Sequence, residues 1–381
     1  MVAIAPERIE AAEVAELPPS FQCLGSDLKQ MPAGAPGKAG VLALHFERRG
    51  ERTRLVHQYS TGPQRVIRAL YLDEALVDMA FVFIQSVGGG ILQGDRLGID
   101  ISVGPGARAH VTTQSAVKVY RMEADYATQR VQVSVGPGGY LELISDYLIP
   151  YRGARFYNEV DLSVATGATM LYADAIAPGR VAFGESYAYK LLHTRLLAHY
   201  PGGGLRAADT TVLEPLRVPP RSPGLLGGYS DLGSMLVLSD SPSGPELAAH
   251  MRDALQDAPD AWGGASALAH GDGAFLRVLG PSSTAVQTAL HCGWRAARQL
   301  LAGTGVPKVH RLKYGFDIDA ANSQRRGERT TSDARPGSLP CVLPLNSGGR
   351  KHSAPTRPER PTLTEHPEPG RQAGSTPPSG S

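Results

Sequence analysis

Between residues 41 and 240, apolar and polar side chains alternate with a period of two over much of the chain. This is the pattern of half-buried β-strands. The stretch VLALHFERRGERTRLVHQYS contains two such runs, and a turn signal follows them at Gly62–Pro63. We therefore expect this part of the chain to consist almost entirely of strands.

Three stretches within this region resemble one another: IDISVGPGARAHVTTQSAVKVY, VQVSVGPGGYLELISDYLIPY and VDLSVATGATMLYADAIAPGR. Their turns fall at Gly104–Gly106, Gly136–Gly138 and Thr166–Gly167, and a fainter copy turns at Gly202–Gly204. A unit of about 30 residues cannot cover its own apolar face, so repeated units are expected to stack. The repeat predicts a mainly β fold, a stacked-strand scaffold resembling a β-helix or solenoid. A sandwich of hairpins is the alternative.

The period changes after residue 240. Ser243 is a predicted N-cap with Pro245 in the first helical turn, and Leu247, Met251 and Leu255 recur at helical spacing. After a strand with the sequence GAFLRVLG, a second helix is expected to begin at Ser282 or Ser283 and to end at Gly303. Its Arg295 and Arg298 lie in the C-terminal half, which the helix dipole favours for cations. A last strand, VHRLKYGF, ends near residue 318.

Composition divides the chain into three parts. With 42% hydrophobic residues, 19% charged residues and a net charge of +2, the 381 residues are typical of a globular protein. Residues 1–40 are expected to be a poorly ordered extension and residues 41–318 a single domain. Residues 319–381 are expected to be a disordered tail, because they are rich in proline and arginine and poor in large apolar side chains.

The chain shows none of the usual signals for export or membrane insertion. Its first 20 residues carry four glutamates and lack a basic start followed by an apolar core. No apolar run approaches the ~18 residues of a membrane-spanning helix. The three cysteines are widely spaced, which fits neither a disulfide framework nor a zinc knuckle. These features predict a cytoplasmic protein, and the scattered basic residues of the tail do not favour nucleic-acid binding.

The stretch VGGGILQGDRL at residues 87–97 resembles a phosphate-binding loop, because four residues separate Gly89 from Gly94. A phosphate-binding loop needs Lys and then Ser or Thr after its last glycine, whereas Asp95 and Arg96 occupy these positions. The following residues read as a strand, so no helix N-terminus is available for a phosphate. The familiar hydrolase, metalloprotease and dinucleotide-binding motifs are also absent from the sequence.

Candidate functional residues lie in the repeats and in the connections that follow them. Polar residues in an apolar β protein are costly to bury unless they are paired. Solvated strand faces would produce the same pattern, so this pattern is compatible with a functional site and with an ordinary polar surface. The candidates are the carboxylates Asp95, Glu142, Asp146, Asp174 and Glu185, and the neighbouring Thr112, Thr113, Gln114, Lys118, Tyr120, Arg121 and Arg180.

Four stretches in the same order resemble the urease accessory proteins called UreD, or UreH in some organisms. They are GGGILQGDRL at 88–97, TTQSAVKVYR at 112–121, LELISDYLIPYRGARF at 141–156 and GRVAFGE at 179–185. The resemblance covers residues 41 to about 318. The two terminal extensions depart from the family pattern but do not touch these motifs.

The resemblance implies a β-helical scaffold with a helical cap and no enzymatic activity. Family members bind apo-urease and the accessory protein UreF, and UreF recruits the GTPase UreG, which carries nickel. A dimeric assembly through the UreF complex is also compatible with the resemblance. No tightly bound cofactor is implied, only transient nickel passing through an internal channel to the urease active site. In such a scaffold, Gly88–Gly90 and Gly94 would permit close backbone approach or positive φ.

Nickel in a channel must be held weakly, and oxygen ligands bind it more weakly than imidazole or thiolate. The resemblance therefore predicts a transient nickel path with Asp95, Glu142, Asp174 and Glu185 as ligands. Its supporting residues would be Thr112, Thr113, Lys118, Tyr120, Arg121 and Arg180. The alternative is a polysaccharide-acting β-solenoid enzyme, in which Glu142 would pair with Asp146 or Asp174.

Overall fold

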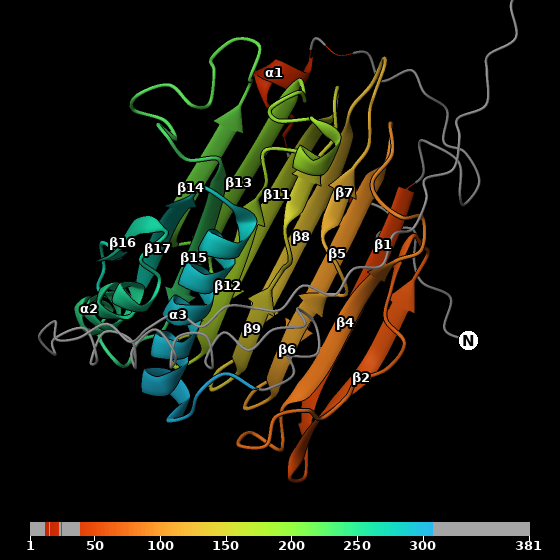
Figure 1. The fold of residues 1–381 in the computed structure, drawn as a ribbon. Helices are drawn as coiled ribbons and strands as arrows, with labels where there is room; N and C mark the ends of the chain where they lie inside the picture. Colours follow the sequence, from red (N-terminus) through yellow and green to blue (C-terminus); the bar gives the residue numbers. More distant parts are fainter. Residues whose placement is uncertain (1–11, 15, 23, 25–38, 308–381) are drawn as a thin grey trace, which may run out of the picture. The chain divides into compact units, whose positions relative to one another are not determined.

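The computed structural model describes residues 12–14, 16–22, 24 and 39–307. Its main feature is a pair of β-sheets that face each other across an apolar core (Figure 1). The first sheet has seven strands in the order β14-β13-β11-β8-β5-β1-β2. Their bounds are β1 Ala39–Arg49, β2 Arg52–Ser60, β5 Arg96–Val103, β8 Ala127–Val135, β11 Arg155–Val164, β13 Leu191–His199 and β14 Leu205–Leu213.

The second sheet has ten strands, eight of which follow the order β16-β17-β15-β12-β9-β6-β4-β3. The other two, β7 and β10, pair with each other, and β10 also pairs with β12. The bounds are β3 Gln64–Arg65, β4 Ala80–Ser86, β6 Arg108–Thr113, β7 Val117–Val119, β9 Tyr140–Ile144, β10 Leu148–Pro150, β12 Thr169–Ile176, β15 Asp231–Leu238, β16 Trp262–Ala267 and β17 Gly273–Gly280.

The sequence repeat builds both sheets at once. In each of the three clear repeats, the first strand joins the first sheet and the second strand joins the second sheet. The turn between them contains a glycine with positive φ, for example Gly106 at 64° and Gly138 at 66°. Successive copies stack parallel and in register, as in Ile99↔Val131 and Val131↔Val160. The predicted stacked-strand, mainly β fold is confirmed.

The fainter fourth copy behaves differently from the other three. Its strands β13 and β14 pair antiparallel within the first sheet, with Leu197 opposite Ala208. The prediction that this segment repeats the earlier unit is therefore wrong in its topology. Gly202 and Gly203 both adopt positive φ, which allows the chain to fold back beside β13 instead of crossing to the second sheet.

Two helices cover the outer face of the second sheet, and both were predicted. Helix α2 spans Gly244–Ala254, and the Ser243 side chain caps it by accepting a hydrogen bond from the Glu246 amide. Helix α3 spans Ser283–Ala302, with Ser282 as N-cap and Gly303 in the left-handed conformation at its end. A short 3₁₀ turn, η4, follows α2 at Leu255–Asp257. The helices bury a second apolar cluster against the sheet.

The described part of the N-terminal extension packs onto the first sheet. Helix α1, Pro19–Gln22, places Phe21 in a cluster with Tyr126, Tyr157 and Leu191, and its side chain is fully buried. The ring centroid of Phe21 lies 5.3 Å from that of Tyr126. This contact was not predicted from the sequence, which indicates a poorly ordered extension over residues 1–40. The domain's first strand also begins within that range, at Ala39.

Several sequence predictions lie outside the described residues, namely the last strand at VHRLKYGF and the tail from residue 319. Within the described residues, no helix is long and apolar enough to cross a membrane.

Strand direction gathers the long connections at one end of the sandwich. Strands β4, β6, β9 and β12 are parallel, so the segments that follow them lie at the same end of the second sheet. We call this the loop end; it lies at the top of Figure 1. It comprises residues 87–95, 114–126, 145–154, 177–190 and, after β14, 214–230. The short strands β7 and β10 lie within it and enclose a third apolar cluster.

Candidate functional site

The glycine-rich stretch forms a tight turn at the loop end. Gly89 and Gly94 have φ values of 75° and 76°, which favour glycine. A side chain at Gly90 would collide with the Lys118 carbonyl, because an added Cβ would lie 2.5 Å from that oxygen. The expectation of close approach and positive φ is thus confirmed for these three glycines. Gly88 meets neither condition.

Asp95 is fully buried inside this turn. Its side chain accepts a hydrogen bond from the Leu92 amide at 2.8 Å, and its carbonyl accepts one from the Thr128 amide at 2.9 Å. These contacts fix the path of the chain into β5. The geometry accordingly gives Asp95 a role in shaping the turn, and it does not line the cavity between the sheets described below.

Glu185 and Arg180 form an ion pair at the loop end. The Arg180 guanidinium donates two hydrogen bonds to the Glu185 carboxylate, at 2.9 and 2.6 Å. The Arg152 amide donates a third at 3.2 Å. The hydrogen bonds from Arg180 hold the pKa of Glu185 below its usual value, against the opposing effect of burial. The hydrogen bond from Arg152 ties the segment after β12 to the segment after β9.

Aromatic rings pack beside this ion pair at the loop end. The Arg180 guanidinium lies 4.1 Å from the centroid of Tyr151 and 5.1 Å from that of Phe183. The rings of Tyr151 and Tyr120 are 4.9 Å apart. Three of the predicted residues, Tyr120, Arg180 and Glu185, are therefore brought together. Two others lie nearby in sequence: Lys118 is part of β7, and Arg121 is exposed and forms an ion pair with Glu123 at 3.4 Å.

This arrangement gives a prediction about acid stability. Because the pKa of Glu185 is lowered in the folded state, its ion pair stabilises the protein above the unfolded-state pKa and stops doing so as the pH falls through the folded-state value. We expect Glu185→Gln to unfold at a lower temperature than the wild type at pH 7, with the gap closing below about pH 4. Thermal unfolding from pH 7 to pH 3 measures this; a gap that widens in acid would contradict it.

Glu142 lies in β9 but faces away from the space between the sheets. Its neighbours Leu141 and Leu143 point into the core between the sheets, whereas Glu142 points toward α3. His110 Nδ1 lies 2.8 Å from one carboxylate oxygen, and the Tyr140 hydroxyl donates to the other at 2.7 Å. Burial opposes ionisation of Glu142, but His110, Arg298 and Tyr140 together keep its pKa below the usual value. Thr112 projects from β6 on the same side as His110 and is buried.

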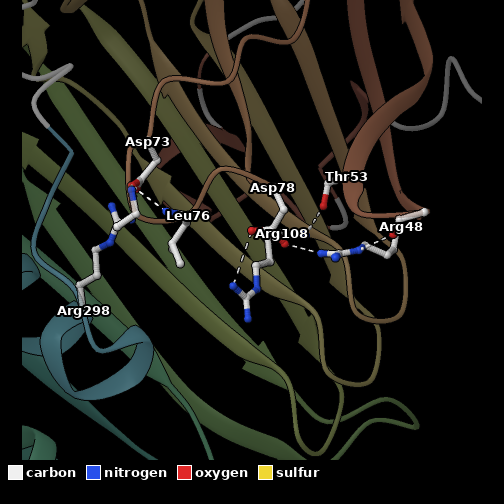
Figure 2. Close-up of polar contacts among 9 residues, drawn as sticks. Arg48, Thr53, Asp73, Leu76, Asp78, Arg108 and Arg298 are labelled. Atoms are coloured by element: carbon white, nitrogen blue, oxygen red, sulfur yellow. Dashed lines mark hydrogen bonds and ion pairs between the residues drawn. The ribbon is translucent and has the colours of Figure 1, made fainter.

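Arg298 of α3 belongs to the same buried cluster of polar side chains as Glu142, His110 and Tyr140. Its side chain is fully buried, with Nε 3.5 Å from Glu142 Oε1. It also forms an ion pair with Asp73, in the segment that connects β3 to β4 (Figure 2). At the other end of that segment, Asp78 binds Arg48 and lies 3.7 Å from Arg108. Arg298 lies in the C-terminal half of the helix, as predicted, but it is buried and joins α3 to the sheet.

A small cavity lined by both polar and apolar side chains lies between the two sheets, next to the loop end. Its volume is about 70 Å³. From the first sheet it is lined by Gln129, Asn158 and Thr194, which occupy one level of three adjacent strands. Gln129 donates to Asn158 at 3.2 Å and accepts a hydrogen bond from Gln64 at 2.9 Å. Apolar side chains of the core, among them Ile99 and Val131, line the same cavity.

The second sheet contributes Thr113 and Asp174 to the same cavity, which Ser145, directly after β9, also lines. The Tyr172 hydroxyl donates to Asp174 at 3.2 Å. Burial raises the pKa of Asp174 to about 6, and the charge of Arg277 offsets only part of that rise. Of the four predicted nickel ligands, Asp174 is the one that lines this cavity, and Thr113 is its predicted companion.

Asp146 connects this cavity to a wider cleft at the loop end. The cleft has a volume of about 610 Å³ and lies between the start of α3 and the segment after β12. Asp146 lines both spaces, and its amide donates to Thr113 Oγ1 at 2.9 Å. Asp231 and Arg221 line the far side of the cleft, and burial raises the pKa of Asp231. The polar cavity is thus adjacent to an opening on the surface.

The described residues hold no group of three or more His, Cys, Asp or Glu side chains that could bind a metal ion together. Such a group would be needed for a tightly held ion. The cavity can offer the carboxylates of Asp174 and Asp146 together with amide and hydroxyl oxygens. That donor set suits brief contact with a hydrated divalent cation better than storage of one.

Comparison with known proteins agrees with the resemblance found in the sequence. The family model described as UreD urease accessory protein matches residues 38–312. The urease accessory protein UreD 2 of Streptomyces griseus is 40% identical over 286 residues, which cover 73% of this chain and 95% of that protein. UreD of Haloarcula marismortui is 38% identical over 290 residues, covering 76% of this chain and 96% of that protein. The chain therefore belongs to the UreD family of urease accessory proteins.

Proposed function

We propose that this chain is a scaffold for urease maturation that binds apo-urease and UreF and, through UreF, the nickel-carrying GTPase UreG. In this proposal it acts in the cytoplasm and helps to deliver nickel to the urease active site without catalysing a reaction itself. Its membership of a family of urease accessory proteins supports the first part. The polar cavity between the sheets, adjacent to a surface cleft, is the observation that carries the second.

The oxygen ligands in this cavity suit a site through which nickel passes without being retained. Carboxylate, amide and hydroxyl oxygens bind nickel more weakly than imidazole or thiolate, so an ion that reaches them can leave again. Asp174 must be ionised to take part. Because its pKa is about 6, it is largely ionised at pH 7, yet protons compete for it more strongly than for an exposed aspartate.

We divide the predicted nickel ligands into residues that line the proposed nickel path and residues that hold the surrounding structure in place. We propose that nickel passes Asp174 and Thr113 together with Asn158 and Gln129, two residues that were not predicted from the sequence. Asp95, Glu142 and Glu185 act as supports, because each is engaged in the contacts that hold a turn, a helix or a loop in place. A path through Glu142 would have to cross the sheet.

The alternative function, a polysaccharide-acting enzyme with paired carboxylates, finds less support in this geometry. Glu142 is fully buried beneath α3, where no polysaccharide could reach it. Asp174 lies on the opposite face of the same sheet, so the two side chains do not flank a common space. Paired catalytic carboxylates need a shared open groove, with roughly 5–9.5 Å between them.

Reconstitution tests the proposed function. Apo-urease, UreF, UreG, nickel and GTP are incubated with and without this chain, and urease activity and bound nickel are measured. We expect both to rise by about tenfold or more when the chain is present, since a required carrier step has no uncatalysed equivalent of similar rate. The chain alone should not hydrolyse urea, nucleotides or glycans. Equal activation without it, or turnover of any of these compounds by the isolated chain, would contradict the proposal.

A further inference from the structure

A short N-terminal strap covers an aromatic patch on the outer face of the first sheet. Phe21 of the strap is fully buried, and its ring centroid lies 5.3 Å from that of Tyr126 and 5.8 Å from that of Tyr157. The family model begins to match at residue 38, so the strap lies outside the part of the chain that it matches. We use the name strap for the described residues 12–14, 16–22 and 24, which include α1 at the loop end of Figure 1.

Hydrogen bonds also hold the strap in place. The Arg130 guanidinium, on the outer face of β8, donates to the Glu13 carbonyl at 3.1 Å. Within the strap, the Phe21 amide donates to the Pro18 carbonyl at 2.8 Å, and the Leu24 amide donates to the Phe21 carbonyl at 3.0 Å. Exchange of these two amide hydrogens with solvent therefore reports whether the strap is docked on the sheet.

Tyr126 connects the strap to the glycine-rich turn. Its ring packs against Phe21 and lies 4.2 Å from the Arg96 guanidinium. Its carbonyl accepts hydrogen bonds from the Gly94 amide at 3.1 Å and from the Arg96 guanidinium at 2.7 Å. Gly94 and Arg96 are the two neighbours of Asp95 in the chain. The strap thus packs on the residue whose backbone holds this turn from both sides of Asp95.

His193 lies beneath the strap, with its ring centroid 6.4 Å from that of Phe21. Its Nδ1 atom is buried and has no hydrogen-bond partner among the described residues. A protonated imidazole needs an acceptor or water at both ring nitrogens, so a proton on His193 is costly while Phe21 covers it. Release of the strap would expose the ring to water and remove that cost.

The charged groups around His193 do not reverse this effect. Burial lowers the pKa of His193, the charge of Arg195 lowers it further, and Glu214 opposes both only in part. From β11, the Tyr157 ring lies 5.1 Å away, and its hydroxyl donates to Glu159 at 2.9 Å. The strap itself presents the apolar ring of Phe21 to His193.

We propose that the strap is a pH-sensitive support, which stabilises the glycine-rich turn while it is docked and loosens the turn when protonation of His193 releases it. The inference concerns coupling within this chain and does not rest on the proposed function. Because the pKa of His193 is lowered in the docked state, docking is strongest above the ordinary value of about 6.5 and weakens as the pH falls below it.

Hydrogen exchange of the full-length chain, measured by mass spectrometry and corrected for the intrinsic effect of pH, tests this inference. Between about pH 7.5 and about pH 5.5, protection of the Phe21 and Leu24 amides should fall about tenfold in the wild type, and protection of the Gly94 amide should fall with it. Phe21→Ala should reduce protection of the Leu24 and Gly94 amides at both pH values, since it removes the buried anchor. His193→Gln cannot be protonated and should keep the strap docked in acid.

His199→Gln is the matched control, because His199 lies on the same face of β13 and is 25% exposed at the other end of the strand. It should show the pH response of the wild type. Strap protection that does not change with pH in the wild type, or that still falls in His193→Gln, would overturn the role of His193. Loss of strap protection in Phe21→Ala without faster exchange at Gly94 would overturn the coupling to the turn.

Discussion

Replacing Arg298 with methionine should lower the free energy of unfolding by about 3–5 kcal/mol, because it leaves buried carboxylates without their cation. For a domain of this size, that corresponds to a fall in Tm of roughly 10 °C. The side chain is fully buried between Glu142 and Asp73, so no water can replace the lost ion pairs. The fall in Tm, measured by calorimetry or by circular dichroism, is the expected result.

Arg295→Met provides the matched control in the same helix. Arg295 also forms an ion pair, with Asp257 at 2.7 Å, but its side chain is 31% exposed. Its loss should cost no more than about 1 kcal/mol. A triple variant that combines Arg298→Met with Glu142→Gln and Asp73→Asn should recover part of the loss, because the uncompensated charges are then removed. Equal losses of stability in Arg298→Met and Arg295→Met would contradict the claim that the buried ion pairs of Arg298 matter more for stability than the partly exposed pair of Arg295.

Much of this fold was predictable because its signals are local. The alternation of side chains marks the strands, the glycines mark the turns, and Ser243, Ser282 and Gly303 mark the helix ends. Stacking followed from the spacing of the repeats. The antiparallel hairpin of β13 and β14 could not be predicted in this way. Its sequence resembles the other repeats, and only the direction of the chain after Gly203 differs.

The candidate site was harder to predict, because a residue belongs to it only if its side chain points to the inner face of a sheet. In β9 the residues YLEL are all buried, so alternation does not indicate which side Glu142 occupies. The structure resolves this through α3, which provides a buried partner in Arg298. Gln129, Asn158 and Thr194 were missed although the repeats place them at one level. Aligning the strands in register would have revealed this row of polar residues.

Replacing Asp174 with asparagine should lower nickel incorporation into urease by roughly tenfold, the lower end of the effects seen when a metal site loses a supporting group. The amide keeps a similar shape and an oxygen for Tyr172, but it has no charge to attract the cation. Arg277 retains its ion pair with Asp209, so the surrounding fold is preserved. Asn158→Leu should have a similar effect, because an apolar wall at this level is poorly crossed by a hydrated ion.

Asp161→Asn is the matched control for this experiment. Asp161 lies on β11, three residues beyond Asn158, and its side chain is 38% exposed on the outer face of the first sheet. It should support normal nickel incorporation. All three variants should still bind UreF and apo-urease, because Asp174 and Asn158 line an internal cavity and Asp161→Asn changes a single exposed side chain.

The most direct measurement is therefore the number of nickel ions per urease active site after maturation with each variant, alongside a pull-down of UreF and apo-urease. We expect low nickel with Asp174→Asn and Asn158→Leu, normal nickel with Asp161→Asn, and intact complexes in every case. Normal nickel loading with both cavity variants would contradict the proposal that nickel passes between the two sheets.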